Sequence, residues 1–169
     1  ARAARLHALA AGATAPAATS AEVDALLQDV TDLRERIEVV HTAQYAQFLE
    51  HVFPVLEALM WRVPGAGAPA GAHPPLAPSM DPDSAAHKVR AKTLEIFTRL
   101  PTNETLRPFI HRLFACCVDV MRHDNEEAAY AAVKIVFELQ RNFRGALDAD
   151  RKDFLHVVRD LYAGFASST

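Results

Sequence analysis

The sequence predicts an all-α fold of antiparallel helices, and three observations support this prediction. Apolar residues recur at steps of three and four along most of the 169-residue chain, and no segment alternates with the period of two that marks a strand. Alanine, which has the highest intrinsic helix propensity, makes up roughly a fifth of the residues. Because 50% of the residues are hydrophobic, the chain also holds enough apolar material for a packed core.

Charge and cysteine content exclude several classes of protein. The net charge of −3 argues against a strongly basic nucleic-acid-binding domain, so no direct nucleic-acid partner is expected. No apolar run reaches the about 18 residues of a membrane span, so we expect no membrane partner. The two cysteines, Cys116 and Cys117, are adjacent, whereas a disulfide framework or a zinc site needs separated residues. We interpret them as reduced core thiols in a protein of a reducing compartment.

Residues 1–21 are predicted to be an alanine-rich N-terminal stub, and residues 22–62 a helical pair. The stub carries Arg2 and Arg5 and no acid before Glu22, a composition that also fits an organelle transit peptide. We favour a helical or disordered part of a longer chain and leave the transit peptide open. The apolar stripe of the first helix of the pair is Val23, Leu26, Leu27, Val30, Leu33, Ile37 and Val40. The apolar stripe of the second helix is Tyr45, Phe48, Leu49, Val52, Val55, Leu56, Leu59 and Met60.

Two details of this pair carry further expectations. Pro54 lies inside the second stripe, so we expect a kink or a fresh helix start there, because proline removes one backbone hydrogen bond. Arg34 and Glu35 lie on the face opposite the first stripe, and we interpret that face as solvated.

Residues 63–83 are predicted to be a linker rich in glycine, alanine and proline, because the helical periodicity stops there. Gly65, Gly67 and Gly71 have a spacing reminiscent of a nucleotide loop, but no strand precedes them and no lysine closes the loop. We therefore expect no nucleotide site and no cofactor.

Residues 84–165 are predicted to hold four helices, followed by a short tail at residues 166–169. The four segments span residues 84–100, 104–122, 125–143 and 150–163. The apolar stripe of 84–100 is Val89, Leu94, Ile96, Phe97 and Leu100, and that of 104–122 is Leu106, Phe109, Ile110, Leu113, Phe114, Cys117, Val118 and Met121. The stripe of 125–143 is Ala129, Ala132, Val133, Val136, Phe137, Leu139 and Phe143, and that of 150–163 is Phe154, Leu155, Val157, Val158, Leu161 and Tyr162.

Turn residues separate these four segments. Pro101 cannot continue the first helix, and Thr102 or Asn103 is positioned to cap the second. Pro108 fits the first position of a restarted helix. Asp124 or Asn125 caps the third segment, and glycine ends it at Gly145.

The spacing of the segments favours a repeat architecture. The segments at 84–100 and 125–143 begin about 41 residues apart, within the period of HEAT and armadillo repeats. The predicted fold is therefore antiparallel helix pairs stacked as a HEAT-like α-solenoid fragment. A generic helical bundle is the alternative.

No catalytic constellation is recognisable in the sequence. The eight histidines form no two-histidine helix motif, and no Gly-x-Ser-x-Gly elbow is present. We therefore expect no catalytic, cofactor-binding or metal-ligating residue, and we assign no partner-binding residue. The basic residues of the second half are scattered among acids, and we interpret them as surface charge rather than a ridge for phosphate or an acidic partner. They are Arg107, Arg112, Arg122, Lys134, Arg141, Arg144, Arg151, Lys152 and Arg159.

Three strings resemble a known family. They are RERIEVVHTAQYAQFLEHVFPVLEALM at 34–60, RLPTNETLRP at 99–108 and HDNEEAAYAAVKIVFELQRNFR at 123–144. In this order they resemble the N-terminal HEAT region of the transformation/transcription domain-associated protein family, which belongs to the phosphatidylinositol 3-kinase-related pseudokinases. The resemblance covers roughly residues 22–163. Within it the linker is much richer in glycine, alanine and proline than the family's usual connection, and the stub at 1–21 has no match in the family.

This resemblance implies a non-enzymatic scaffold segment of a large nuclear co-activator subunit. Family members belong to histone acetyltransferase complexes of the SAGA type and its nucleosome-acetylating relative. The implied partners are protein subunits of such a complex, transcription activators and the rest of the protein's own solenoid. The family's C-terminal pseudokinase domain is not part of this sequence, and no functional residue of the family maps onto it.

Two other functions remain as alternatives. The helical pattern alone also fits a HEAT-repeat adaptor of another pathway, such as transport or a phosphatase scaffold. The composition of residues 1–21 alone would fit a small helical protein of an organelle.

Overall fold

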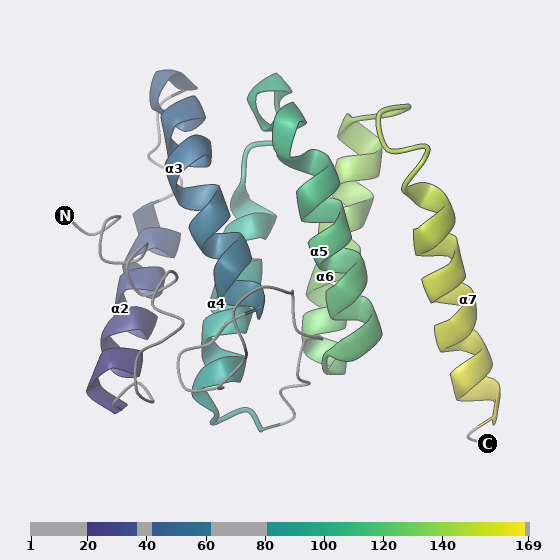
Figure 1. Ribbon diagram of the computed structural model, residues 1–169, viewed down its shortest axis with the longest axis horizontal. Helices are drawn as coiled ribbons and strands as arrows, with labels where there is room; N and C mark the ends of the chain where they lie inside the picture. Colours follow the sequence, from purple (N-terminus) through teal and green to yellow (C-terminus); the bar gives the residue numbers. More distant parts are fainter. Residues whose placement is uncertain (1–19, 37–41, 62–80, 168–169) are drawn as a thin grey trace. The chain divides into compact units, whose positions relative to one another are not determined.

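A computed structural model of the chain describes residues 20–36, 42–61 and 81–167, and within these ranges every regular element is helical. The prediction of an all-α fold is confirmed for this part of the chain. It holds six α-helices and one 3₁₀ helix: α2 (Ser20–Arg36), α3 (Thr42–Trp61), α4 (Ala85–Arg99), η2 (Glu104–Phe109), α5 (Ile110–His123), α6 (Glu126–Asn142) and α7 (Arg151–Ser167) (Figure 1).

The chain divides into two compact units, Ala1–Leu100 and Pro101–Thr169. The stub at 1–19, most of the expected linker (62–80) and the end of the chain (168–169) lie outside the described residues, as do the expected stripe residues Ile37 and Val40. None of the helices in the described ranges combines the length and the apolar character needed to cross a membrane.

The core of the first unit lies around α4, which packs against both α2 and α3. Leu26 and Val30 of α2 and Leu94 of α4 are fully buried. On the other side, the rings of Phe53 on α3 and Phe97 on α4 lie 5.6 Å apart between centroids. Each fully buried side chain of this kind stabilises the fold by about 1.5–3 kcal/mol, so α4 is the central packing element of the unit.

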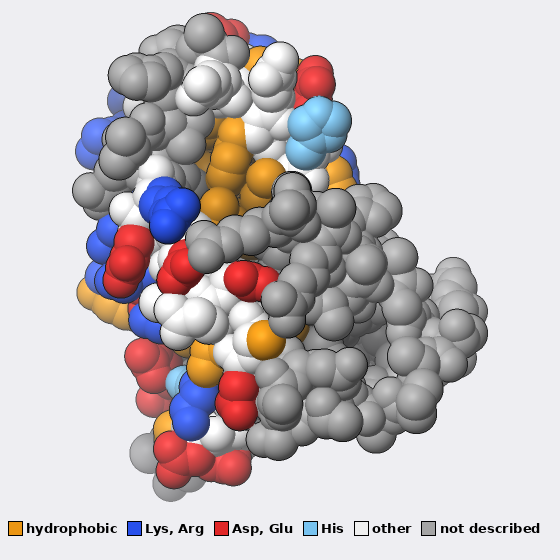
Figure 2. All heavy atoms as spheres, turned by 90° about the vertical axis from the view of Figure 1, so that its left-hand side faces the viewer, with side chains coloured by type: hydrophobic (Ala, Val, Ile, Leu, Met, Phe, Trp, Pro, Cys, Tyr) orange, Lys and Arg blue, Asp and Glu red, His pale blue; other side chains and the backbone are white. Residues whose placement is uncertain are grey.

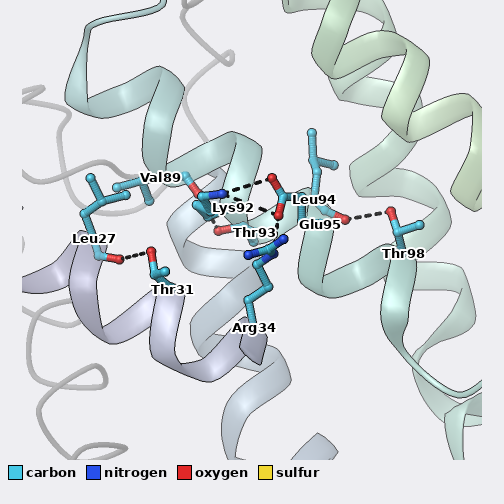
Figure 3. Close-up of polar contacts among 9 residues, drawn as sticks. All are labelled: Leu27, Thr31, Arg34, Val89, Lys92, Thr93, Leu94, Glu95 and Thr98. Carbon is cyan, nitrogen blue, oxygen red and sulfur yellow. Dashed lines mark hydrogen bonds and ion pairs between the residues drawn. The ribbon is translucent and has the colours of Figure 1, made fainter. Parts of the chain in front are cut away.

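Polar contacts also join α2 to α4 (Figure 3). Arg34 forms an ion pair with Glu95, and Lys92 approaches the same carboxylate at 3.2 Å. The side chain of Arg34 is only 27% exposed, so the interpretation of this position as part of a solvated face is wrong. The carboxylate of Glu95 compensates the charge of Arg34, so the cation can be partly buried at the edge of the interface between the two helices.

Pro54 does not start a new helix. It lies inside α3, which is continuous from Thr42 to Trp61, and the side chain of Pro54 is exposed. The proline therefore occupies the outer face of the helix, away from the packed side that carries Phe53 and Leu56.

The core of the second unit lies around α5, which contacts η2, α6 and α7. Only Asp124 and Asn125 separate α5 from α6, so the two helices form an antiparallel hairpin (Figure 1). On α7, Phe154 meets Phe114 of α5 edge to face at 6.2 Å. At the end of α6, the guanidinium of Arg107 lies 5.7 Å from the ring centroid of the buried Phe143.

The turn residues largely act as predicted. The Asn103 side chain accepts a hydrogen bond from the Thr105 amide, and the Asn125 side chain accepts one from the Ala128 amide at 2.9 Å. Gly145 adopts a positive φ of 82°, which a residue with a Cβ rarely tolerates.

The segment predicted as one helix from 104 to 122 is two elements. Residues Glu104–Phe109 form a 3₁₀ helix, and α5 starts only at Ile110. Pro108 lacks an amide hydrogen and cannot take part in an α-helical hydrogen bond to residue 104, so the regular helix begins just after it.

Candidate interaction surface

The large apolar side chains that are exposed in the described residues gather on two helices of the second unit. On α6 they are Tyr130 and Phe137, and on α7 they are Leu155, Val158 and Tyr162. The periodicity placed four of these five in core stripes, and that prediction is wrong for Phe137, Leu155, Val158 and Tyr162. The stripe on each helix is wider than the surface its neighbours cover.

On α6 the core and the exposed surface lie on opposite sides. Ala132, Val136 and Leu139 are buried against α5, and Phe143 closes the same side. Tyr130 and Phe137 are 62% and 63% exposed. They share a face with two cations, because residues three and four apart are neighbours on a helix. We call the row Tyr130, Lys134, Phe137 and Arg141 the α6 ridge.

Within the α6 ridge the cations contact side chains of their own helix. The ammonium of Lys134 lies 4.2 Å from the ring centroid of Tyr130, in the geometry of a cation–π contact. Arg141 lies 3.3 Å from the carboxylate of Glu138, and both side chains remain about half exposed or more. The ridge is therefore ordered by local contacts and still open to solvent.

One side of α7 contacts α5, and a second side carries exposed apolar side chains. Val157 is buried, and Phe154 reaches the ring of Phe114. Leu155, Val158 and Tyr162 recur at steps of three and four along the side that adjoins this packed side, and Tyr162 is 76% exposed. We call these three residues the α7 stripe.

The scattered basic residues do not form one patch on a single element. Four of them contact an acid within three residues in the sequence: Arg107 with Glu104, Arg141 with Glu138, Arg151 with Asp148 and Arg159 with Asp160. The hydrogen bond from Arg107 lowers the pKa of the exposed Glu104 carboxyl below its ordinary value. On the face shown in Figure 2, acidic and basic side chains are likewise interspersed among the described residues.

Two histidines of the second unit lie beside an aspartate, His123 within its own helix and His111 across the fold. His123 lies 3.5 Å from Asp119, one turn earlier on α5. His111 of α5 lies 2.8 Å from Asp150, the residue before α7, a contact that only the tertiary fold creates. In the described ranges, no cluster of three or more histidine, cysteine, aspartate or glutamate side chains has the arrangement of a metal site.

Both cysteines are free and buried, which confirms their interpretation as core thiols. Burial raises the pKa of the Cys117 thiol well above its ordinary range. A neutral, enclosed thiol is a poor nucleophile, so this pair gives no reactive centre.

Comparison with known proteins shows homology to a set of very large transcription proteins. The chain is 35% identical over 143 residues to "Probable transcription-associated protein 1" of Dictyostelium discoideum, which covers 85% of this chain and 3% of that protein. It is 28% identical over 137 residues to the human "Transformation/transcription domain-associated protein", covering 81% of this chain and 3% of the relative. It is 25% identical over 144 residues to the "SAGA complex/NuA4 acetyltransferase complex subunit TRA1" of Saccharomyces cerevisiae, covering 82% and 4%.

The chain thus spans only about 3–4% of the length of these curated relatives. No family model matches the chain. No solved structure matches it either.

Proposed function

We propose that this chain is a non-enzymatic scaffold segment of a large transcription co-activator subunit in histone acetyltransferase complexes of the SAGA and NuA4 type. The observation that carries the proposal is the homology over more than four fifths of the chain to proteins of this kind, one of which is named as a subunit of both complexes. The resemblance of the strings at 34–60, 99–108 and 123–144 supports a position in the N-terminal HEAT region.

The second part of the proposal is that the helix pairs stack as an α-solenoid. In such folds each helix buries its apolar side only against its neighbours, and the surface is used to bind other proteins. The hairpin of α5 and α6 and the additional contact of α7 with α5 support this arrangement within the second unit. The uncovered α7 stripe is the kind of surface that a further helix of the same polypeptide would pack against.

The third part concerns partners and location. Homologues are subunits of chromatin-modifying complexes, so we propose a nuclear protein whose partners are complex subunits, transcription activators and the rest of its own solenoid. A scaffold of this kind acts by presenting surfaces, which agrees with the exposed apolar side chains of α6 and α7.

Affinity purification of the full-length protein from its own cells tests the function. Mass spectrometry of the nuclear fraction should recover acetyltransferase subunits together with the tagged protein, and the eluate should acetylate nucleosomes. Recovery of transport or phosphatase components instead, with no acetyltransferase activity, would establish the alternative adaptor function and refute ours.

Hydrogen exchange tests the solenoid. The amides of residues 155–162 should exchange at least about tenfold more slowly in the full-length protein than in the 169-residue chain, because a neighbouring helix would restrict opening of α7. Amides in α5, which is already covered on several sides, serve as the internal control and should change far less. Equal exchange of α7 in both proteins would contradict a stacked neighbour.

A further inference from the structure

The exposed residues of the α6 ridge are placed symmetrically about the middle of the helix. Its two aromatic rings, Tyr130 and Phe137, lie equally far from a midpoint between positions 133 and 134. Outside them, the exposed Glu126 at the start of the helix and the exposed Arg141 near its end are also equidistant from that midpoint. The outer face of α6 therefore carries Glu126 near one end, Arg141 with its own-helix partner Glu138 near the other, and one aromatic ring on each side of the centre.

Such a face is complementary to a copy of itself turned end for end. At 1.5 Å of rise per residue, Tyr130 and Phe137 each lie about 5 Å from the midpoint along the helix axis, and Glu126 and Arg141 each lie about 11 Å from it. Two antiparallel copies would therefore place Tyr130 against the second copy's Phe137. They would also place Glu126 opposite the second copy's Arg141, and both contacts would occur twice by symmetry.

We propose that the α6 ridge is a self-association surface, occupied by α6 of a second copy of this chain in an antiparallel, two-fold arrangement. Charge repulsion disfavours a parallel pair, which would oppose Glu126 to Glu126 and Arg141 to Arg141. An isologous two-fold contact is also the commonest arrangement among soluble homo-oligomers.

Lys134, which lies close to the two-fold axis, is compatible with this arrangement. Its ammonium lies over the ring of its own Tyr130, one turn toward the start of the helix. In an antiparallel pair the two ammonium groups therefore lean in opposite directions and end about 10 Å apart along the axis. Each would lie at the edge of the contact between its own Tyr130 and the second copy's Phe137, close to both aromatic rings.

The association is expected to be weak. A single pair of helices buries less than the about 1,200–2,000 Å² of a stable protein–protein interface. We expect a dissociation constant on the order of 10–100 µM, with lower affinity at high salt because the outer contacts are ionic.

Sedimentation equilibrium of the 169-residue chain tests this surface. The apparent mass should rise from 18.5 kDa toward twice that value as the concentration passes from about 10 to about 500 µM, a range that brackets the expected constant. Tyr130→Ser combined with Phe137→Ser should keep the chain monomeric throughout this range. Leu155→Ser combined with Tyr162→Ser, on the α7 stripe, is the matched control and should leave the association unchanged.

Charge exchange identifies the antiparallel register. Glu126→Arg and Arg141→Glu should each weaken self-association at least tenfold, because each change opposes like charges. A mixture of these two variants should associate as the unchanged chain does, since both outer contacts are then restored. The double variant Glu126→Arg/Arg141→Glu should also regain self-association, which shows that the single variants had not simply unfolded.

Three results would overturn the proposal. The unchanged chain could stay monomeric up to the highest concentration, or its association could depend on the α7 stripe instead of the α6 ridge. Mixing the two charge variants could also give no more association than either variant alone, which would exclude the antiparallel register.

Discussion

Arg34 on α2 and Glu95 on α4 form an ion pair across the interface between these two helices. The pair is partly screened by solvent, because the two side chains are 27% and 41% exposed. It also involves Lys92, so that two cations share the carboxylate of Glu95. The contact links segments that lie on either side of residues 62–80, and it therefore reports on the packing of the whole first unit.

Glu95→Gln should lower the free energy of unfolding by about 1 kcal/mol, as expected for a half-buried ion pair that leaves its cation uncompensated. Glu138→Gln, which breaks the more exposed pair of Arg141 and Glu138, is the control and should cost less than about 0.5 kcal/mol. Urea denaturation followed by circular dichroism measures both. Equal losses in the free energy of unfolding would show that the ion pair between α2 and α4 stabilises the fold no more than an ordinary surface ion pair does.

The start of α4 allows a comparison of two adjacent residues. The Ser84 hydroxyl accepts a hydrogen bond from the His87 amide, whereas the side chain of Asp83 is exposed and lies 3.7 Å from the ammonium of Lys88. Ser84→Ala should therefore destabilise the unit by about 1 kcal/mol, and Asp83→Ala by less than about 0.5 kcal/mol. Thermal unfolding of the two variants tests the assignment, and the reverse order would make Asp83 the functional cap.

Gly145 is required for its backbone conformation rather than for space. Its φ is 82°, and a Cβ built at this position would meet no atom within 4 Å. Gly145→Ala should therefore cost about 1–2 kcal/mol through backbone strain alone. Gly145→Asn should cost less, because asparagine tolerates this region better. If both changes proved neutral in urea denaturation, the turn would not depend on a positive φ.

The sequence was sufficient to predict the helices and most of their ends. Periodicity and turn residues act over a few positions, and such local effects determine where Asn103 and Asn125 cap their helices. The prediction that Pro108 takes the first position of a restarted helix is wrong, because Pro108 lies inside the 3₁₀ helix η2 and α5 begins at Ile110. The missing amide hydrogen of Pro108 explains why no regular α-helix runs through residues 104–109, so this cause is local as well.

The surfaces of α6 and α7 could not be predicted in the same way. A stripe at helical spacing marks an apolar face, but it does not reveal how much of that face a neighbour covers. Phe137 and Phe143 both fit the apolar pattern of α6, yet only Phe143 is buried. The contacts between Arg34 and Glu95 and between His111 and Asp150 were missed because each joins residues far apart in the sequence.

The two cysteines should be inert in the folded chain. Burial raises the pKa of the Cys117 thiol, so it stays protonated throughout the physiological range, and alkylation by iodoacetamide should not accelerate between pH 7 and pH 9. Above the ordinary thiol pKa of 9.0 the unfolded chain ionises and the folded chain does not, so stability should fall as the pH rises further. Both thiols should react readily in denaturant, whereas fast alkylation under native conditions would contradict their burial.

Phe137 and Phe143 provide the sharpest test of which face of α6 is core. Phe143→Ala should cost about 3–5 kcal/mol, because it empties a buried site and removes the ring on which Arg107 lies. Phe137→Ser should change the stability of the monomer by less than about 0.5 kcal/mol, since its side chain is 63% exposed. Measurement at low micromolar concentration keeps self-association out of the comparison. A large loss for Phe137→Ser under these conditions would mean that another part of the same chain covers the α6 ridge, and the ridge would then be unable to receive a second copy.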